Sequence, residues 1–332
     1  LVARAAQDPS IDLKIFTALT LTTPQIKSDM KARFLLPAEK RLFGNYPELL
    51  YVEMMREGNL PQNIQVNEFF LMAGQWLNNE IAQQNYIPAN YTYALPYLLD
   101  RGLNLVLPLI CEQEGQCSFS CNPDIMADLL KKRRTGKADF VFAAQVNDNL
   151  PFMYGEAVFP KEEIDLLLNS ADTQFELYCA PKRPVDLAEQ AIGLHAARLI
   201  EDGGTLQIGI GSIGDAVAKA LILRHQNNDE FKSLMHHLDN GDNADIYHDG
   251  PFEEGLYGLS EMFVDGFLHL AEADILKREV DGAILHGGFF VDCHDFYNKL
   301  HTMPEEQRRR FHMMPVSFTA SMKGAGSDRT PV

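Results

Sequence analysis

The strongest constraint on this chain is a glycine-rich stretch at residues 203–217. It reads Gly-Gly-Thr-Leu-Gln-Ile-Gly-Ile-Gly-Ser-Ile-Gly-Asp-Ala-Val. Residues 205–210 have the composition of a short β-strand, and the residues from Asp215 onward have the apolar spacing of a helix. The stretch therefore predicts a turn that leads from a strand into a helix. Such a turn presents backbone N–H groups and a helix N-terminus, which suit a bound anion or a polarised carbonyl group.

Three of these glycines also match a dinucleotide-binding fingerprint. Gly209, Gly211 and Gly214 satisfy the pattern G-x-G-x-x-G. That fingerprint needs a second strand that ends in an acidic residue about twenty positions further on. Here residues 224–232 are polar and have no strand pattern, which indicates a loop or a helix end. An NAD(P)- or flavin-dependent oxidoreductase is therefore an alternative, but the sequence shows no acidic residue at the expected position to bind the ribose of the cofactor.

A second run, at residues 255–266, reads Gly-Leu-Tyr-Gly-Leu-Ser-Glu-Met-Phe-Val-Asp-Gly. Together the two runs resemble the acetyl-CoA hydrolase/transferase family, which includes CoA-transferases of the 4-hydroxybutyrate and succinyl-CoA:acetate type. Its members have a Thr-Leu-Gln-x-Gly-Ile-Gly-x-Ile-x-Asp-Ala-Val run and then a Gly-x-x-(Thr/Ser)-Glu-Met-Phe-x-Asp-Gly run. Residues 205–217 and 258–266 match these in the same order. Two ordered motifs are far more specific than three glycines.

The resemblance implies a catalytic glutamate at Glu261 and a function in acyl-CoA and acetate metabolism. CoA would pass between an acyl-CoA and a small carboxylate through a glutamyl-CoA thioester. Hydrolysis by the same glutamate differs only in the attack of water, and the sequence leaves both reactions open. Coenzyme A would enter as a substrate, with no metal and no permanently bound cofactor. A non-catalytic CoA-binding protein is a further alternative, and so is Glu261 as a capping or exposed acid at a helix start.

Several further residues are candidates for contacts with substrate. The backbone N–H groups of Gly209, Gly211 and Ser212 would meet CoA or an oxyanion, because glycine lets the backbone approach closely. Gly287 and Gly288 form a second glycine pair, at the end of a strand predicted from residue 283. His286 directly precedes this pair, and it is either a base or a hydrogen-bonded core residue.

The first half of the chain has the pattern of a parallel sheet. Residues 103–110 and 140–146 are apolar enough for buried strands, and a helix is predicted between them at residues 124–134. Gln145 and Asn147 lie at the end of the second strand. Ligands of open α/β sheets bind beyond the carboxyl ends of strands, so both side chains are placed to touch substrate. Alternatively, Asn147 caps a turn.

Two prolines, Pro181 and Pro184, mark the expected domain boundary. We expect two open α/β domains with mainly parallel sheets, similar to the NagB/RpiA/CoA-transferase fold, at residues 1–184 and 185–332. The resemblance ends near Phe318, and relatives have a strand and a glycine-containing turn before residue 1. The chain is therefore interpreted as a fragment of a longer enzyme, with a truncated start and an incomplete second domain.

The charge and the apolar content of the chain limit the classes of partner that it can bind. The net charge is −17, and no basic block is longer than residues 131–134. This argues against nucleic acid and against an anionic membrane surface as a partner. No apolar run approaches the roughly 20 residues of a membrane helix. The resemblance implies an acyl-CoA and a small carboxylate as substrates and a homodimer for the full-length protein.

The five cysteines are odd in number and scattered, which fits a reducing cytoplasm. Cys111, Cys117 and Cys121 are close in sequence, but their spacing matches no zinc signature. Residues 224–254 carry histidines and aspartates, including Asp239, Asp242 and Asp245. No i, i+4 pair occurs among these three aspartates and the histidines at 225, 236, 237 and 248, so we interpret the segment as an exposed acidic insertion and expect no metal.

Overall fold

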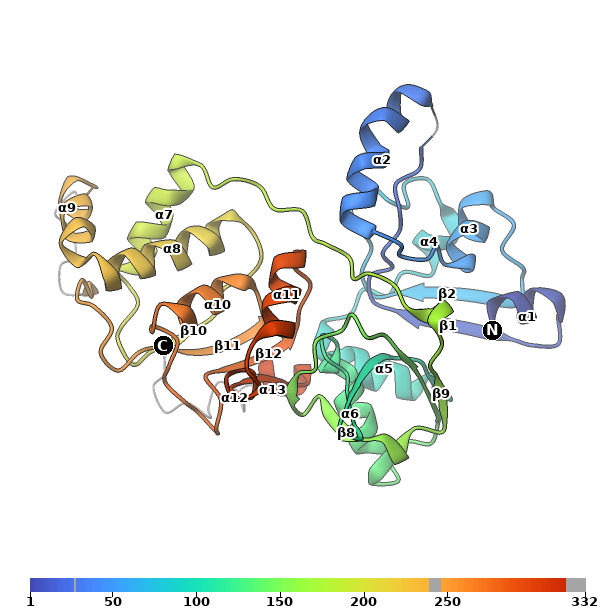
Figure 1. Cartoon of the computed structure of the whole chain (residues 1–332). Coiled ribbons are helices and arrows are strands. Elements are labelled where there is room, and N and C mark those ends of the chain that lie inside the picture. Colours follow the sequence, from blue (N-terminus) through green and yellow to red (C-terminus); the bar gives the residue numbers. More distant parts are fainter. Residues whose placement is uncertain (27, 239–245, 321–332) are drawn as a thin grey trace. The chain divides into compact units, whose positions relative to one another are not determined.

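A computed structural model describes residues 1–26, 28–238 and 246–320 of the chain. It divides into two compact units, Leu1–Leu103 and Asn104–Val332 (Figure 1). The domain boundary expected at residue 184 stays a prediction. None of the described helices combines the length and the apolar character that crossing a lipid bilayer requires.

The first unit is built on one pair of parallel strands. β1 and β2 pair from Leu13↔Ile64 to Thr17↔Glu68. Helix α3 buries Tyr51, Val52 and Met55 in a core that also contains Val66, Trp76 and Ala82. The elements are α1 (Val2–Gln7), β1 (Leu13–Thr17), α2 (Asp29–Phe43), α3 (Leu50–Glu57), β2 (Ile64–Glu68), α4 (Glu80–Gln84), η1 (Tyr91–Tyr93) and α5 (Ala94–Asp100).

The second unit opens with a six-stranded sheet in which β6 pairs in parallel with β3, β4 and β9. The strand expected at residues 103–110 is interrupted between β3 and β4, which pair with the same side of β6 in one register, while β9 pairs with its other side. Pro108 lies at the break, and a proline has no N–H for a strand ladder. The elements are β3 (Leu105–Val106), β4 (Leu109–Gln113), β5 (Gln116–Ser118), α6 (Pro123–Arg134), β6 (Val141–Val146), β8 (Val158–Pro160), η2 (Lys161–Glu163), β9 (Leu166–Leu168) and η3 (Ala171–Thr173).

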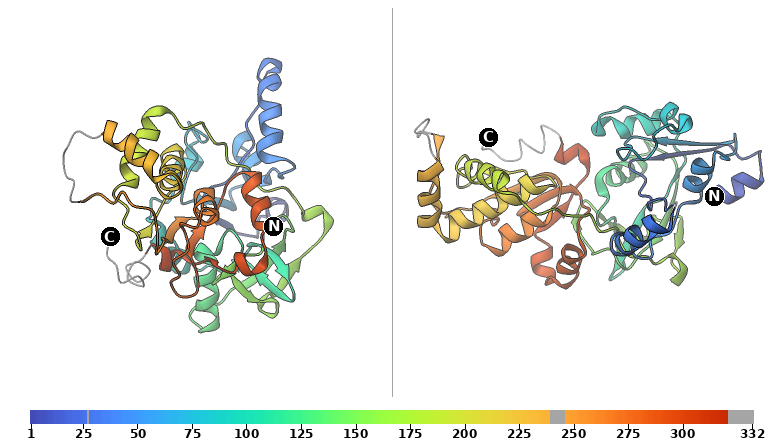
Figure 2. Two further views of the ribbon diagram at one scale, coloured as in Figure 1. Left: turned by 60° about the vertical axis from the view of Figure 1, so that its left-hand side comes forward. Right: turned by 90° about the horizontal axis from the view of Figure 1, so that it is seen from above.

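The rest of the second unit surrounds a five-stranded sheet in the order β10-β11-β12-β13-β7, in which every pair is parallel. Helices α7 and α8 lie side by side, as Figure 1 and Figure 2 show. The elements are β7 (Tyr154–Gly155), α7 (Leu187–Ala197), β10 (Thr205–Leu206), α8 (Ser212–Gln226), α9 (Asn228–Leu238), β11 (Tyr257–Met262), α10 (Asp265–Glu272), β12 (Leu285–Phe289), α11 (His294–Thr302), α12 (Glu305–Arg308), β13 (Phe311–Met313) and α13 (Val316–Thr319). The prediction of an α/β fold with mainly parallel sheets is confirmed.

The prediction that residues 224–254 form an exposed insertion is wrong for residues 224–238, the first part of this segment that the structure describes. Helix α9 buries Phe231 and Met235. Arg224 is 1% exposed, and its guanidinium donates to the carbonyl oxygens of Ala197, Ile200 and Gly250. A buried arginine satisfied by three carbonyls anchors this segment, and no apolar run in the sequence signals it. Asp239, Asp242 and Asp245 lie outside the described residues.

Candidate functional site

The two glycine-bearing runs of the sequence lie next to each other in the parallel sheet. β10 pairs with β11 through Thr205↔Tyr257 and Leu206↔Gly258. Beyond this pairing, the Ser260 hydroxyl donates to the carbonyl oxygen of Ile208 at 3.2 Å. The glycine turn and the strand that carries Glu261 are therefore joined directly.

The predicted strand-to-helix turn is present, although its strand is shorter and its helix starts earlier than expected. The strand ends at Leu206, and α8 begins at Ser212 with Gly211 as its N-cap. Gly211 has φ +117°, in the range that favours glycine. A Cβ on Gly214 would lie 2.4 Å from the carbonyl oxygen of Gly209, whereas a Cβ on Gly209 would meet nothing within 4 Å. Gly214 is thus needed for packing, and Gly209 leaves open space in front of the helix N-terminus.

Ser212 has a role that sequence reasoning missed. Its side chain is buried, and its hydroxyl donates to Glu189 of α7. The same carboxylate accepts from Arg183 and from the Asp186 N–H as part of a capping box. The turn therefore has a guanidinium held close to it by Glu189. Its signal in the sequence is the Asp-x-x-Glu pattern at residues 186–189.

Glu261 lies near the carboxyl end of β11, which excludes a capping role. Helix α10 begins at Asp265 with Val264 as its N-cap, so Glu261 is a strand residue. Its side chain is half-buried. Among the described residues, none donates a hydrogen bond to its carboxylate or forms an ion pair with it within 4 Å. A partly desolvated carboxylate with open oxygens is available to react.

The predicted glycine pair lies across from this glutamate on β12. The register pairs Ser260 with Gly287 and Met262 with Phe289, so Glu261 lies across from Gly288. A Cβ on Gly288 would come within 2.7 Å of the Glu261 carbonyl oxygen and 3.0 Å of the Thr319 hydroxyl. A Cβ on Gly287 would lie 3.1 Å from the Cβ of Phe263. Both glycines are buried and allow close backbone approach at this edge of the sheet.

Gln145 and Asn147 lie at the end of β6, as expected, and their amides bind the end of η3 and the chain just after it. The Gln145 amide donates to the carbonyl oxygen of Thr173 at 3.0 Å. Asn147 is fully buried, and it donates to the carbonyl oxygen of Phe175 at 3.0 Å. Its own amide oxygen accepts from the N–H of Asn149. Asn147 does organise a turn, and substrate contact by either side chain stays a prediction.

His286 is a buried, neutral residue of β12. Its Nδ1 lies 2.6 Å from the Tyr257 hydroxyl. Burial, and then the neighbouring His312, lower the pKa of His286 to about 4. A histidine with this pKa carries no charge at neutral pH and has one ring nitrogen already engaged. This is the geometry of a hydrogen-bonded core residue.

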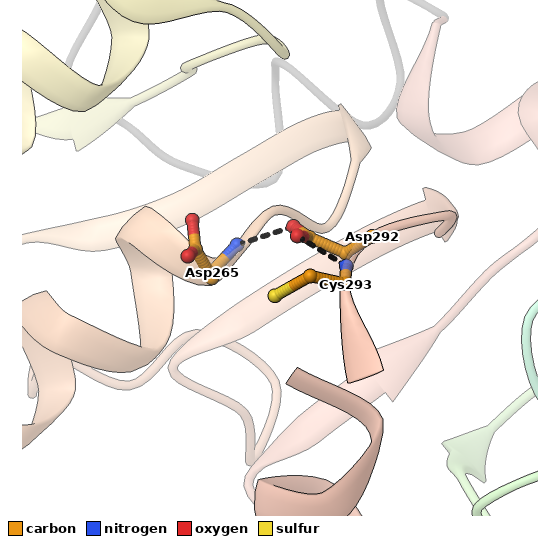
Figure 3. A group of neighbouring side chains, drawn as sticks. All are labelled: Asp265, Asp292 and Cys293. Atoms are coloured by element: carbon orange, nitrogen blue, oxygen red, sulfur yellow. Dashed lines mark hydrogen bonds between the residues drawn. The ribbon is translucent and has the colours of Figure 1, made fainter. Parts of the chain in front are cut away.

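Sequence reasoning also missed a charged cluster just beyond β11 and β12 (Figure 3). It contains Asp265, Asp292 and Cys293, whose potential ligand atoms lie within 4.8 Å of one another. Lys182 forms ion pairs with both aspartates. The ammonium group therefore supplies the cation at this cluster. Lys182 lies in the proline-flanked connection, where the sequence predicts only a linker.

The dinucleotide alternative is not supported by the elements after the turn. Residues 224–226 close α8, and residues 228–238 form α9. The strand that should end about twenty residues after the glycines is therefore replaced by helix.

Comparison with known proteins shows what this chain is similar to. No family model matches the chain. It is 33% identical over 212 residues to the 4-hydroxybutyrate coenzyme A transferase of Clostridium kluyveri. The aligned region covers 62% of this chain and 40% of that protein. It is 28% identical over 169 residues to the succinyl-CoA:cyclohexane-1-carboxylate CoA transferase of Geobacter metallireducens. This second aligned region covers 48% of this chain and 35% of that protein. The chain thus matches less than half the length of these relatives.

A solved structure supports the fold. The 4-hydroxybutyrate CoA-transferase of Porphyromonas gingivalis superimposes with a TM-score of 0.57 at 19% identity, over 96% of this chain and 68% of that one. The predicted resemblance to CoA-transferases of the 4-hydroxybutyrate and succinyl-CoA type is confirmed by these matches. Over 62% of its length, the chain is similar in sequence to a 4-hydroxybutyrate coenzyme A transferase.

Proposed function

We propose that the full-length protein transfers CoA between an acyl-CoA thioester and a small carboxylate, with Glu261 as the nucleophile. The observation that carries the proposal is the position of Glu261. Its carboxylate has no partner among the described residues, and it lies on the strand joined to the glycine turn by Ser260. The homologous proteins named as CoA-transferases support the reaction class.

The reaction balances with the two substrates and Glu261 alone. A carboxylate oxygen of Glu261 attacks the thioester carbonyl carbon, the C–S bond breaks, and CoA leaves as a thiolate. The thiolate then attacks the glutamyl carbonyl of the resulting anhydride, which releases the first acid as a carboxylate and leaves a glutamyl-CoA thioester. An incoming carboxylate reverses both steps and departs as the new acyl-CoA. No net proton is taken up.

A carboxylate is a weak nucleophile, so the site must supply most of the rate. Fixing the carboxylate against the thioester carbonyl contributes roughly 7–11 kcal/mol. An oxyanion donor adds about 3–4 kcal/mol. We assign the donors to the backbone N–H groups of Gly209, Gly211 and Ser212. The first N–H groups of α8 have no acceptor within the helix, and the helix dipole favours negative charge there.

The remaining assignments follow from position. Gly287 and Gly288 let β12 approach β11 closely beside Glu261, and we assign them to the substrate side of this edge. Gln145 and Asn147 shape the chain after β6. The acceptor is a small carboxylic acid, and CoA is a substrate in place of a resident cofactor. The homodimer and the cytoplasmic location stay predictions.

The test is to trap the covalent intermediate on the full-length protein. It is incubated with acetyl-CoA, treated with borohydride, and digested for peptide mapping by mass spectrometry. We expect reduction of the thioester to modify Glu261 and no other acid. Turnover is followed with acetate or another small carboxylate present and then withheld. Transfer requires the acceptor, whereas hydrolysis releases free CoA without it.

Glu261→Gln should abolish both the modification and the turnover, and Glu253→Gln is the matched control because Glu253 is exposed. An unmodified Glu261 in a protein that still consumes acyl-CoA would contradict the mechanism. Binding of CoA without reaction would favour the non-catalytic alternative, and acyl-CoA consumption that needs NAD would favour the oxidoreductase.

A further inference from the structure

The loops that follow β11 and β12 are tied together by one buried aspartate. Asp292 is 2% exposed. Its Oδ2 accepts the N–H of Asp265 at 3.0 Å, and its Oδ1 accepts the N–H of Cys293 at 2.7 Å (Figure 3). Asp265 is only four residues after Glu261, and the N–H of Phe263 between them donates to the carbonyl oxygen of Phe289 at 2.8 Å. The backbone just beyond Glu261 is therefore held by β12 and its loop.

Lys182 reaches this point from a distant part of the second unit. Its ammonium lies 2.9 Å from Oδ1 of Asp292 and also pairs with Asp265. The segment that carries it is fixed in place. The N–H of Ala180 donates to the Asp292 carbonyl oxygen at 2.9 Å, and the Tyr297 hydroxyl donates to the carbonyl oxygen of Tyr178 at 2.9 Å. Lys182 is thus presented to the aspartates by a fixed backbone.

The charges at this edge of the sheet are unbalanced without the lysine. Asp215, Asp265 and Asp292 follow the neighbouring strands β10, β11 and β12, and Lys182 is their shared cation. Burial raises the pKa of Asp215, and the charges of Asp265 and Asp292 raise it further, while Lys182 opposes the rise. Burial disfavours the charged form of Lys182, yet its bonds to the two aspartates raise the pKa of the ammonium.

We propose that Lys182 is a positioning residue for Glu261. The inference rests on the proposed function. Lys182 neutralises the acids beyond β11 and β12 and clamps the two loops, which fixes the backbone that follows Glu261 and keeps excess negative charge from the reacting carboxylate. Developing negative charge on the thioester oxygen and the CoA sulfur is costly beside uncompensated carboxylates.

The test compares Lys182→Met and Lys182→Arg in the full-length protein. Lys182→Met keeps the length of the side chain and removes its charge. We expect kcat to fall by about 10- to 100-fold with KM for acyl-CoA little changed, because a misplaced reacting group loses rate more than binding. Lys182→Arg should recover most of the loss. Melting temperatures of both variants control for folding.

A pH profile separates positioning from simple structural support. Asp265 and Asp292 pair with the ammonium that is lost, and Asp215 of α8 and Cys293 interact with it electrostatically. His269 of α10 lies 3.9 Å from Asp265. In Lys182→Met one carboxylate should take up a proton more readily, so kcat should rise relative to the native protein as pH falls from 8 to about 5.5. Adding Asp265→Asn to Lys182→Met should recover part of the rate at pH 8.

Failure of the positioning role and failure of the proposed function would give different results. A trapped adduct on Glu261 in the native protein, together with unchanged kcat in Lys182→Met, would overturn the positioning role and leave the proposed function intact. The positioning role would also be overturned if Lys182→Met lost the same fraction of its rate at every pH, had a lower melting temperature, and was matched in both respects by Lys182→Arg. If the native protein forms no adduct, the proposed function fails and the positioning role fails with it.

Discussion

Gly288 lies so close to Glu261 that a Cβ on the glycine would come within 2.7 Å of the glutamate's carbonyl oxygen. Real Cβ atoms do not approach a backbone oxygen this closely, so β11 and β12 would have to separate. The spacing of the two strands at Glu261, the proposed nucleophile, therefore depends on the absence of a side chain at this position.

Gly288→Ala should consequently damage both the fold and the rate. Overpacking of this kind costs about 1–3 kcal/mol of unfolding free energy, and displacement of Glu261 should lower kcat by about 10- to 100-fold. Urea unfolding and steady-state kinetics measure the two effects. Gly250→Ala is the matched control because a Cβ there meets nothing within 4 Å. Equal behaviour of the two variants would show that the close approach does not matter.

Gly209 and Gly214 should separate binding from packing within one turn. A Cβ on Gly209 enters open space, so Gly209→Ala should unfold like the native protein. If CoA binds against this backbone, KM for acyl-CoA should rise about 10-fold, which corresponds to about 1.4 kcal/mol. Gly214→Ala places its Cβ 2.4 Å from the Gly209 carbonyl oxygen and should lower the melting temperature. An unchanged KM in Gly209→Ala would remove Gly209 from the CoA site.

His286 should make stability depend on pH. Its pKa is lowered to about 4 by burial and by His312, whereas the unfolded chain titrates near 6.5. The unfolded state therefore binds a proton first as pH falls, and the stability present above pH 6.5 is lost progressively down to about pH 4. The full effect is roughly 3 kcal/mol.

Urea unfolding at pH 7.5 and pH 4.5 measures this effect, and His286→Gln should show a smaller difference between the two pH values. His312 also has a lowered pKa and contributes in the same direction, so a residual slope is expected. A native protein that is equally stable at both pH values would contradict the assignment of a buried neutral histidine.

The turn and the strands of the parallel sheet were predictable because their signals are local. Glycines at residues 209–214 and apolar runs such as residues 140–146 report backbone conformation and burial directly. The boundary at Leu206 and the split at Pro108 were missed, since the ladder partners that end a strand lie elsewhere in the chain. Glu261 was proposed as the nucleophile through its surrounding motif, because an acid on a strand end carries no signal of its own.

The charged cluster could not be predicted in the same way. Lys182 is 83 residues before Asp265 and 110 before Asp292 in the sequence (265 − 182 and 292 − 182). Its neighbours are prolines, which predict a connection and say nothing of the side chain's partners. Arg224 is similar, because a charged residue among polar ones predicts exposure until three carbonyl groups are folded around it.

The last strand of the parallel sheet has a consequence for how the chain can be divided. β7 pairs with β13 through His312↔Tyr154 and Met313↔Gly155, so residues from before the proline-flanked connection complete the sheet that carries Glu261. A protein cut at residue 184 would leave β13 with a row of unpaired N–H and C=O groups. Such an edge recruits strands from other molecules. The two halves of this sheet are therefore expected to be soluble only when they are made together.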